Sequence, residues 1–150
     1  MMMTNFRRHG AIIALFALLP LQVLNAAETE DVIKYRQNVM RVIGGHTGAL
    51  FAIAGNKAGD PSHMGVHVRG LVDISTIAGD IFPEGSDFGE TRAKPEIWSD
   101  PDGFAMALKN FQDAAMGVGN AFDNNGDMGA ALKKLGGACK GCHDDYRSKE

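Results

Sequence analysis

The sequence predicts an all-α fold: an antiparallel four-helix bundle with a long crossover between helices 2 and 3. Apolar residues recur at three- and four-residue steps along four segments. Turn-forming residues separate these segments, and the longest separation lies between the second and the third. Two short connections and one long one are typical of a four-helix bundle.

The four predicted helices are bounded by capping and turn residues. The first covers about residues 29–54 and ends at Gly55-Asn56. The second and third open at Asp60-Pro61 and Asp100-Pro101, each an N-cap followed by proline at the first helical position. The second ends near Gly79, the third ends at the turn of residues 123–126, and the fourth covers about 128–147.

The stretch between the second and third helices, residues 80–99, is rich in glycine and proline and is predicted to be irregular. A loop of this length in a small domain is uncommon unless it packs on the fold or serves the function. Phe82, Ile97 and Trp98 are the expected anchors that hold it across the bundle.

The N-terminus has the pattern of a secretory signal peptide, predicted to cover residues 1–26. Arg7 and Arg8 precede a short apolar run, residues 11–19, and small residues follow at positions 24–26. A short membrane anchor is the alternative, but the run is too short to span a bilayer. The domain is then predicted to cover residues 27–150, with export to the periplasm and no membrane attachment after cleavage.

The charge balance makes nucleic acid an unsuitable partner. Without Arg7 and Arg8, 13 of the 15 basic residues remain against 18 acidic ones, a net charge of −5. Nucleic-acid binding depends on basic surface that neutralises phosphates. Basic redox proteins are compatible partners, although charge alone does not identify one.

The strongest motif is Cys139-Lys140-Gly141-Cys142-His143, because C-x-x-C-H is the pattern of covalent attachment of one haem c. On a helix, residues i and i+3 share a face, so both sulfurs reach the same side of a porphyrin. The adjacent His143 would then be an axial ligand of the iron. Haem c is attached outside the cytoplasm, which agrees with the predicted signal peptide.

Three other interpretations of the cysteine pair are less favoured. A thiol–disulfide oxidoreductase places C-x-x-C at a helix N-terminus, where the thiol pKa is lowered. A zinc site needs four ligands and usually a second cluster. A structural disulfide suits a helical C-x-x-C poorly. No other catalytic constellation is visible, so an enzyme is not expected.

A second axial ligand would have to come from upstream of the motif, since only seven residues follow His143. His63 and His67 are four residues apart on the second helix, which is a possible metal pair, although a solvated face is the simpler interpretation. Methionines in apolar stripes are usually core residues. The candidates are His46, His63, His67, Met40, Met64, Met106, Met116 and Met128.

Four segments together resemble the class II cytochromes c, and most closely the cytochrome c′ family. They are residues 32–37 (VIKYRQ), 82–86 (FPEGS), 94–98 (KPEIW) and 137–147 (GACKGCHDDYR). They span nearly the whole predicted mature chain, so the resemblance is specific.

The resemblance implies a homodimer that pairs through the first two helices, a haem with His143 as its protein ligand, and binding of NO and CO. Met40 matches the side chain over the opposite iron face, and Arg36 matches a basic residue near the haem. Arg147 matches the basic residue beside the proximal histidine. Because some class II relatives use a methionine at the Met40 position as a ligand, a six-coordinate electron carrier remains the alternative to a pentacoordinate gas-binding protein.

Overall fold

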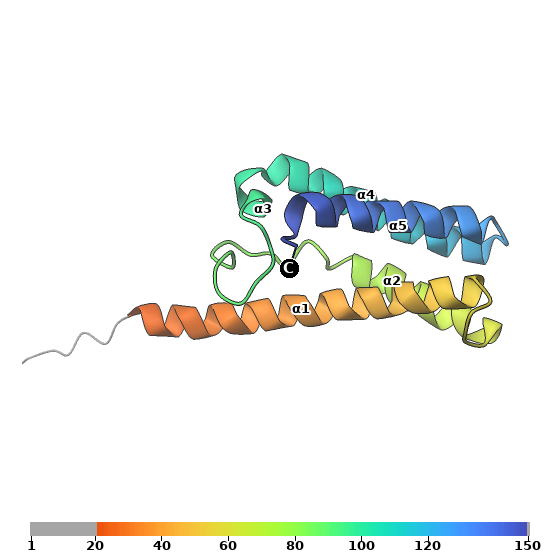
Figure 1. The fold of residues 1–150 in the computed structure, drawn as a ribbon, viewed down its shortest axis with the longest axis horizontal. Coiled ribbons are helices and arrows are strands. Elements are labelled where there is room, and N and C mark those ends of the chain that lie inside the picture. Colours follow the sequence, from red (N-terminus) through yellow and green to blue (C-terminus); the bar gives the residue numbers. More distant parts are fainter. Residues whose placement is uncertain (1–20, 150) are drawn as a thin grey trace, which may run out of the picture.

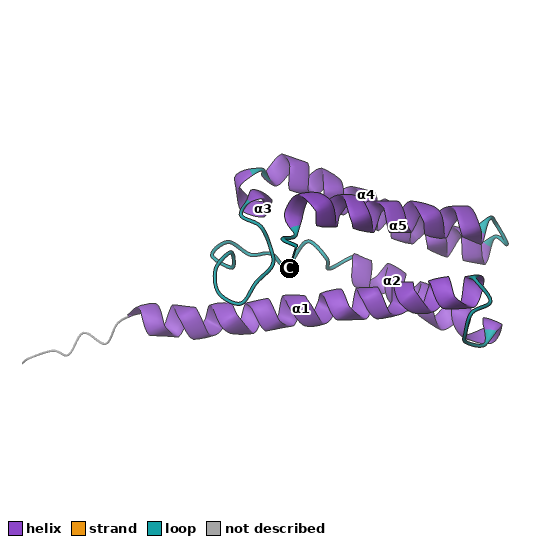
Figure 2. Ribbon diagram, in the orientation of Figure 1, coloured by secondary structure: helices purple, strands orange, loops and turns teal. Residues whose placement is uncertain are grey.

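The regular elements of the protein are helices. The computed structural model describes residues 21–149, with side chains from Glu28 onward. Within that range Figure 2 shows helices and loops, which confirms the all-α prediction. The elements are α1 (Leu21–Ala54), η1 (Pro61–His63, a 3₁₀ turn), α2 (Met64–Ser75), α3 (Glu96–Ser99), α4 (Pro101–Asp123) and α5 (Met128–Tyr146).

The four main helices form two pairs that stack on each other. Figure 1 shows α1 beside α2 and α4 beside α5, with the connection between α2 and α4 gathered at one end of the bundle. The C-terminal end of α5 lies at that same end. The largest fully buried apolar side chains come from all four helices: Leu50, Leu71, Val118 and Leu135. The core therefore runs through both pairs, and burial of this apolar surface is the main stabilising term.

The first helix is longer than predicted. It begins at Leu21 instead of residue 29. Residues 21–28 contain no glycine or proline and are mostly good helix formers, so nothing in them ends the helix. Residues 1–20 of the predicted signal peptide lie outside the described part of the chain, while the predicted cleavage point after Ala26 falls inside α1. None of the helices within residues 21–149 has the length and apolarity to cross a membrane.

The second helix is shorter than predicted, because α2 ends at Ser75 and not near Gly79. The Ser75 hydroxyl donates to the carbonyl of Val72 at 2.7 Å, and the Thr76 hydroxyl donates to that of Asp73 at 2.7 Å. Such side-chain bonds to the backbone compete with the helical ladder. The chain continues through residues 76–81 in tight turns, and Ala78 and Ile81 remain buried.

The connection between α2 and α4 is anchored as predicted but is less irregular. Ile97 is buried, and the indole Nε1 of Trp98 donates to the carbonyls of Phe82 (3.2 Å) and Pro83 (3.1 Å). These contacts tie the two ends of the connection together. The short helix α3 was not predicted, since four residues are too few to show a helical period.

Helix starts follow the capping chemistry of aspartate. The Asp100 carboxylate accepts from the backbone N–H of Gly103 at 3.2 Å, as predicted for α4. Asp60 accepts from the N–H of Ser62 at 2.8 Å, although the element it caps is η1 and not α2. Asp127, which the sequence analysis did not single out, caps α5 through the N–H of Ala130 at 2.9 Å.

Candidate functional site

Cys139, Cys142 and His143 lie on the last two turns of α5, at the end of the bundle where the connection between α2 and α4 also lies. Their spacing, i, i+3 and i+4, puts all three on one side of the helix. Both cysteines are partly buried and free, so they are not bonded to each other. Both sulfurs are therefore available for covalent attachment.

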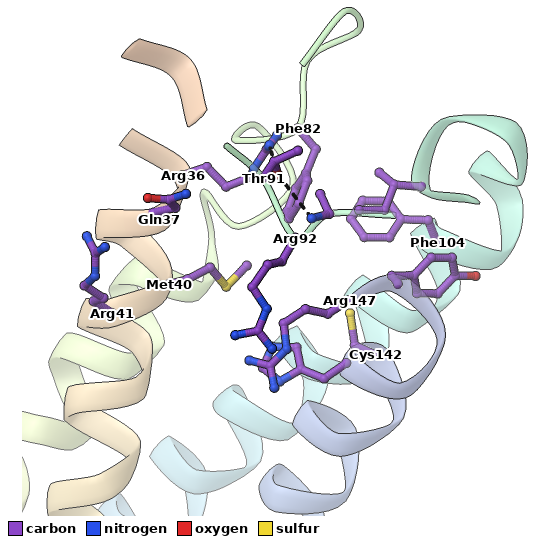
Figure 3. A pocket seen from close by; sticks show the side chains of 14 residues that line it. Arg36, Gln37, Met40, Arg41, Phe82, Thr91, Arg92, Phe104, Cys142 and Arg147 are labelled. Atoms are coloured by element: carbon purple, nitrogen blue, oxygen red, sulfur yellow. Dashed lines mark hydrogen bonds between the residues drawn. The ribbon is translucent and has the colours of Figure 1, made fainter. Parts of the chain in front are cut away.

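Two adjoining cavities of about 400 and 470 Å³ lie between this end of α5, α1 and the connection from α2 to α4. Such volumes are typical of cofactor and ligand sites. Figure 3 shows the first cavity, with Met40 reaching in from α1, Cys142 from α5 and Arg147 from the position directly after α5. The side chains that line both cavities are Met40, Phe82, Phe104, Cys142, His143 and Arg147.

The two cavities differ in chemistry. The first is lined by four arginines, Arg36, Arg41, Arg92 and Arg147, and its lining includes no carboxylate. The second is lined mostly by apolar side chains of α1 and α4 and by Cys139. A flat apolar group with anionic substituents matches this combination, since the arginines would compensate its charges and the apolar walls would cover its faces.

Arg36 is the most deeply buried charge of the site, with 3 % of its surface exposed. Its guanidinium donates to the hydroxyl (2.8 Å) and carbonyl (2.9 Å) of Ser86 and to the hydroxyl of Thr91 (2.8 Å). It also lies over the rings of Phe82 and Trp98, at 5.1 and 5.9 Å from their centroids. These hydrogen-bond partners are neutral, so an anionic group in the cavity would complement its charge.

Arg36 anchors the face of α1 that also carries Met40. The two residues are four apart on α1 and therefore lie on the same face of the helix. The hydrogen bonds of Arg36 tie that face to the connection between α2 and α4. Met40 is partly buried and packs against the hydrophobic core, which gives it a defined place opposite α5.

A second set of contacts joins the same connection to the end of α5. Ala93 and Arg147 form an isolated antiparallel bridge, and the N–H of Lys94 donates to the carbonyl of Tyr146 at 3.0 Å. The Lys94 ammonium donates to the carbonyls of Asp144 (3.0 Å) and Asp145 (2.8 Å). A cation at these carbonyls favours the C-terminal end of the helix. As a result, the side chains of Arg92 and Arg147 both extend into the first cavity (Figure 3).

Burial and neighbouring charges shift the pKa values of the three side chains of the motif. Burial lowers the pKa of His143, and the nearby positive charges of Arg147 and Arg92 lower it further. The imidazole is therefore kept neutral, which is the form that binds a metal. Burial also raises the pKa of both cysteines, whereas a redox-active dithiol needs a lowered pKa.

Most of the candidate second ligands lie elsewhere. Of the eight histidines and methionines considered, only Met40 lines these cavities of the described chain. Met106 and Met116 are exposed, Met64 and Met128 pack against the core, and His63 is exposed. His46 and His67 contact each other. Arg92 and Arg41 were not predicted as site residues, because nothing in their local sequence indicates that the fold gathers them beside the motif.

A helical bundle that carries C-x-x-C-H at the end of its last helix defines a class of protein, the helical c-type cytochromes. The family model described as cytochrome c′ matches residues 31–147. The chain belongs to the cytochrome c′ family.

Individual relatives agree with this assignment. The chain is 31 % identical over 146 residues to cytochrome c′ of Rhodospirillum rubrum, covering 95 % of this chain and 99 % of the relative. The crystal structure of cytochrome c′ from Rubrivivax gelatinosus aligns with a TM-score of 0.75 at 34 % identity, covering 80 % of this chain and 97 % of that one. A ferrous variant of cytochrome c′ from Alcaligenes xylosoxidans with bound NO aligns with a TM-score of 0.74 at 31 % identity, covering 81 % and 97 %.

Membership of this family implies covalently bound haem c, and the residues present fit that group. Two free sulfurs three residues apart, a neutral imidazole next to them and a cavity with apolar walls and an arginine-rich edge are what it requires. Cys139 and Cys142 would hold it covalently and His143 would ligate its iron. When bound, haem supplies an iron centre that exchanges electrons and binds diatomic gases.

Proposed function

We propose that the protein is a periplasmic cytochrome c′ with one haem and a pentacoordinate, high-spin iron that binds NO and CO or transfers electrons. The observation that carries the proposal is the placement of Met40 and His143 in the lining of the same two cavities, on α1 and α5. His143 is assigned as the protein ligand, and Met40 as the apolar side chain over the opposite face. A relative with a TM-score of 0.74 binds NO, which supports gas binding here.

The apolar second cavity supports an open iron face. Its lining around Met40 includes Ile43, Gly44 and Leu108, which offer no strong donor or charge. A neutral diatomic enters such surroundings at little desolvation cost, whereas a charged ligand loses its hydration without compensation. Met40 packed against the core would act as a steric cover that a small gas displaces.

Arg147 is assigned to the proximal side, one turn after His143. Its positive charge, joined by that of Arg92, disfavours anionic character on the imidazole. A less electron-rich imidazole is a weaker iron ligand, so the pair of cations favours an iron–histidine bond that breaks easily. This role rests on the position of both guanidinium groups in the first cavity.

The alternative is a six-coordinate, low-spin electron carrier with Met40 as the second axial ligand. The optical spectrum of the holoprotein separates the two, recorded oxidised, reduced and reduced with CO. We expect the wild type to have a high-spin spectrum that shifts when CO is added. Before CO is added, Met40→Leu should have the same spectrum as the wild type. Low-spin bands unmoved by CO in the wild type, which become high-spin in Met40→Leu, would assign Met40 as a ligand and make electron transfer the leading role.

We further propose that both thiols are attachment points and not a catalytic dithiol, so that the protein is not an enzyme of that class. The raised pKa of each cysteine supports this assignment. Intact mass of the mature holoprotein tests it, because one attached haem adds its mass and consumes both thiols. The expected N-terminus of protein from the periplasmic fraction is Ala27. Cys139→Ser and Cys142→Ser are each expected to lose one of the two thioether links.

A homodimer through α1 and α2 is part of the proposal. Tyr35 and Val42, seven residues apart on α1, and Val66 on α2 are exposed large apolar side chains, which supports an interaction surface on these two helices. Sedimentation of the holoprotein tests it. A dimer that dissociates in Val66→Glu, with an unchanged optical spectrum, is expected, and a wild-type monomer at all concentrations would contradict it.

A further inference from the structure

Two histidines from different helices meet on the side of the bundle formed by α1 and α2. Nδ1 of His46 lies 3.1 Å from Nδ1 of His67, with the ring centroids 5.4 Å apart and the ring planes at 63°. The spacing in the sequence instead suggests His63 and His67 as a pair on one helix. The fold gives His67 a partner 21 residues earlier and leaves His63 exposed.

The His46 ring occupies space on α2 that is open because residue 70 is glycine. A methyl group added at Gly70 would lie 2.5 Å from Cε1 and 2.6 Å from Nε2 of His46. The imidazole therefore packs directly on the backbone of α2, in a hollow that any other residue would fill. Both rings are partly buried, which limits the orientations available to them.

The separation of the two nitrogens matches that of ligands sharing one metal ion. With metal–nitrogen bonds of about 2.0–2.1 Å, two imidazole nitrogens in a square-planar or tetrahedral site are about 2.9–3.4 Å apart. We propose that His46 and His67 chelate a divalent transition-metal ion, such as Cu²⁺ or Zn²⁺, through their two Nδ1 atoms and so join α1 to α2. The proton shared in the hydrogen bond then moves to a ring Nε2, so that two neutral rings release no net proton.

The remaining coordination positions are open. No group of three histidine, cysteine, aspartate or glutamate side chains in the described part of the chain is arranged to hold a metal. The ion would therefore have two protein ligands and complete its shell with water, which makes it exchangeable and leaves room for an external ligand. Imidazole pairs of this kind favour Cu²⁺ over Zn²⁺.

The site is independent of the proposed haem function. Neither His46 nor His67 lines the two cavities beside Cys142 and His143. Binding of an ion between α1 and α2 would therefore leave the optical spectrum of the haem unchanged. This separation lets the failure of one proposal be told apart from failure of the other.

Titration of the holoprotein with Cu²⁺, followed by electron paramagnetic resonance, tests the proposal, with calorimetry for Zn²⁺. We expect one ion per chain, nitrogen coordination in the Cu²⁺ spectrum and a higher midpoint of thermal unfolding. His46→Asn and His67→Asn should each weaken binding by more than about tenfold. His63→Asn is the matched control and should bind as the wild type does. Wild-type affinity in either pair variant, or no binding by the wild type, would overturn the proposal.

Gly70→Ala provides a variant that keeps both ligands. Its added methyl group displaces the His46 ring, so Cu²⁺ affinity should fall by about tenfold or more while both imidazoles remain. An unchanged optical spectrum and helical circular dichroism would establish that this variant is folded. Unchanged affinity in the folded variant would contradict the geometry on which the site depends.

Discussion

Replacement of Arg36 by alanine is the sharpest test of how the site is held together. Three hydrogen bonds of 2.8–2.9 Å join its guanidinium to Ser86 and Thr91, although those residues are 50 and 55 positions away in the sequence. The variant removes the main polar link between α1 and the segment that follows α2. We expect a loss of stability and a loosened position of Met40, since the two side chains share a helical face.

The expected loss follows from the contacts. Three hydrogen bonds at about 1 kcal/mol each give roughly 3 kcal/mol. The ring contacts with Phe82 and Trp98 add roughly 1 kcal/mol. Burial of the guanidinium is itself costly, because desolvation disfavours its charged form and lowers the pKa of Arg36. The alanine variant no longer bears this desolvation cost, which offsets part of the loss of stability. The net prediction is a loss of about 3 kcal/mol in the free energy of unfolding.

Guanidinium denaturation of the holoprotein, followed by circular dichroism, measures this quantity. Lys34→Ala is the matched control, because Lys34 is exposed on the same helix, lies outside both cavities and pairs with Glu30 one turn earlier. It should change stability by less than about 0.5 kcal/mol. Arg36→Lys, which keeps the charge but not the planar fork, should fall between the two. A loss in Arg36→Ala below about 1 kcal/mol would refute the reasoning.

Three further predictions concern the core, a helix cap and acid stability. Leu135→Ala deletes a fully buried side chain and should cost about 3 kcal/mol in chemical denaturation. Asp127→Ala removes the acceptor for the N–H of Ala130 and should cost about 1 kcal/mol, whereas Asp127→Ser should retain most of the stability. Burial and the neighbouring His67 lower the pKa of His46, so the unfolded chain binds a proton at that residue more readily than the folded one. Stability should therefore fall as the pH drops from about 7 towards 5, and His46→Asn should flatten that slope.

The helices were predictable where sequence pattern and packing agree. Both Asp-Pro pairs mark real element starts, and the buried positions Phe111, Ala115 and Val118 of α4 recur at the three- and four-residue steps that the sequence analysis used to predict helices. The errors lie at boundaries. No residue between Leu21 and Glu28 breaks the helix, and the end of α2 depends on hydrogen bonds of Ser75 and Thr76 that periodicity does not encode.

Residue spacing predicts the site only where its residues are close in sequence, whereas the family resemblance also pointed to Arg36 and Met40 on the first helix. Cys139, Cys142 and His143 form a local motif, so their shared face follows from helical geometry alone. The placement of Arg92 beside Arg147, and of His46 against His67, depends on how distant segments cross. Spacing within one helix suggested the pair of His63 and His67, but the nearest imidazole to His67 belongs to α1.

The long connection between α2 and α4 is what turns two helix pairs into one site. Met40 is on α1 and His143 is on α5, and these helices belong to different pairs (Figure 1). The segment between α2 and α4 joins the two sides of the site. At one end of the site, Arg36 donates hydrogen bonds to Ser86 and Thr91 of this connection. At the other, Lys94 binds the last turn of α5. A loop held at both edges therefore helps to set the separation between Met40 and His143, the two residues proposed for opposite faces of the haem. Substitutions in this loop are expected to alter the proposed gas binding without changing either of these residues.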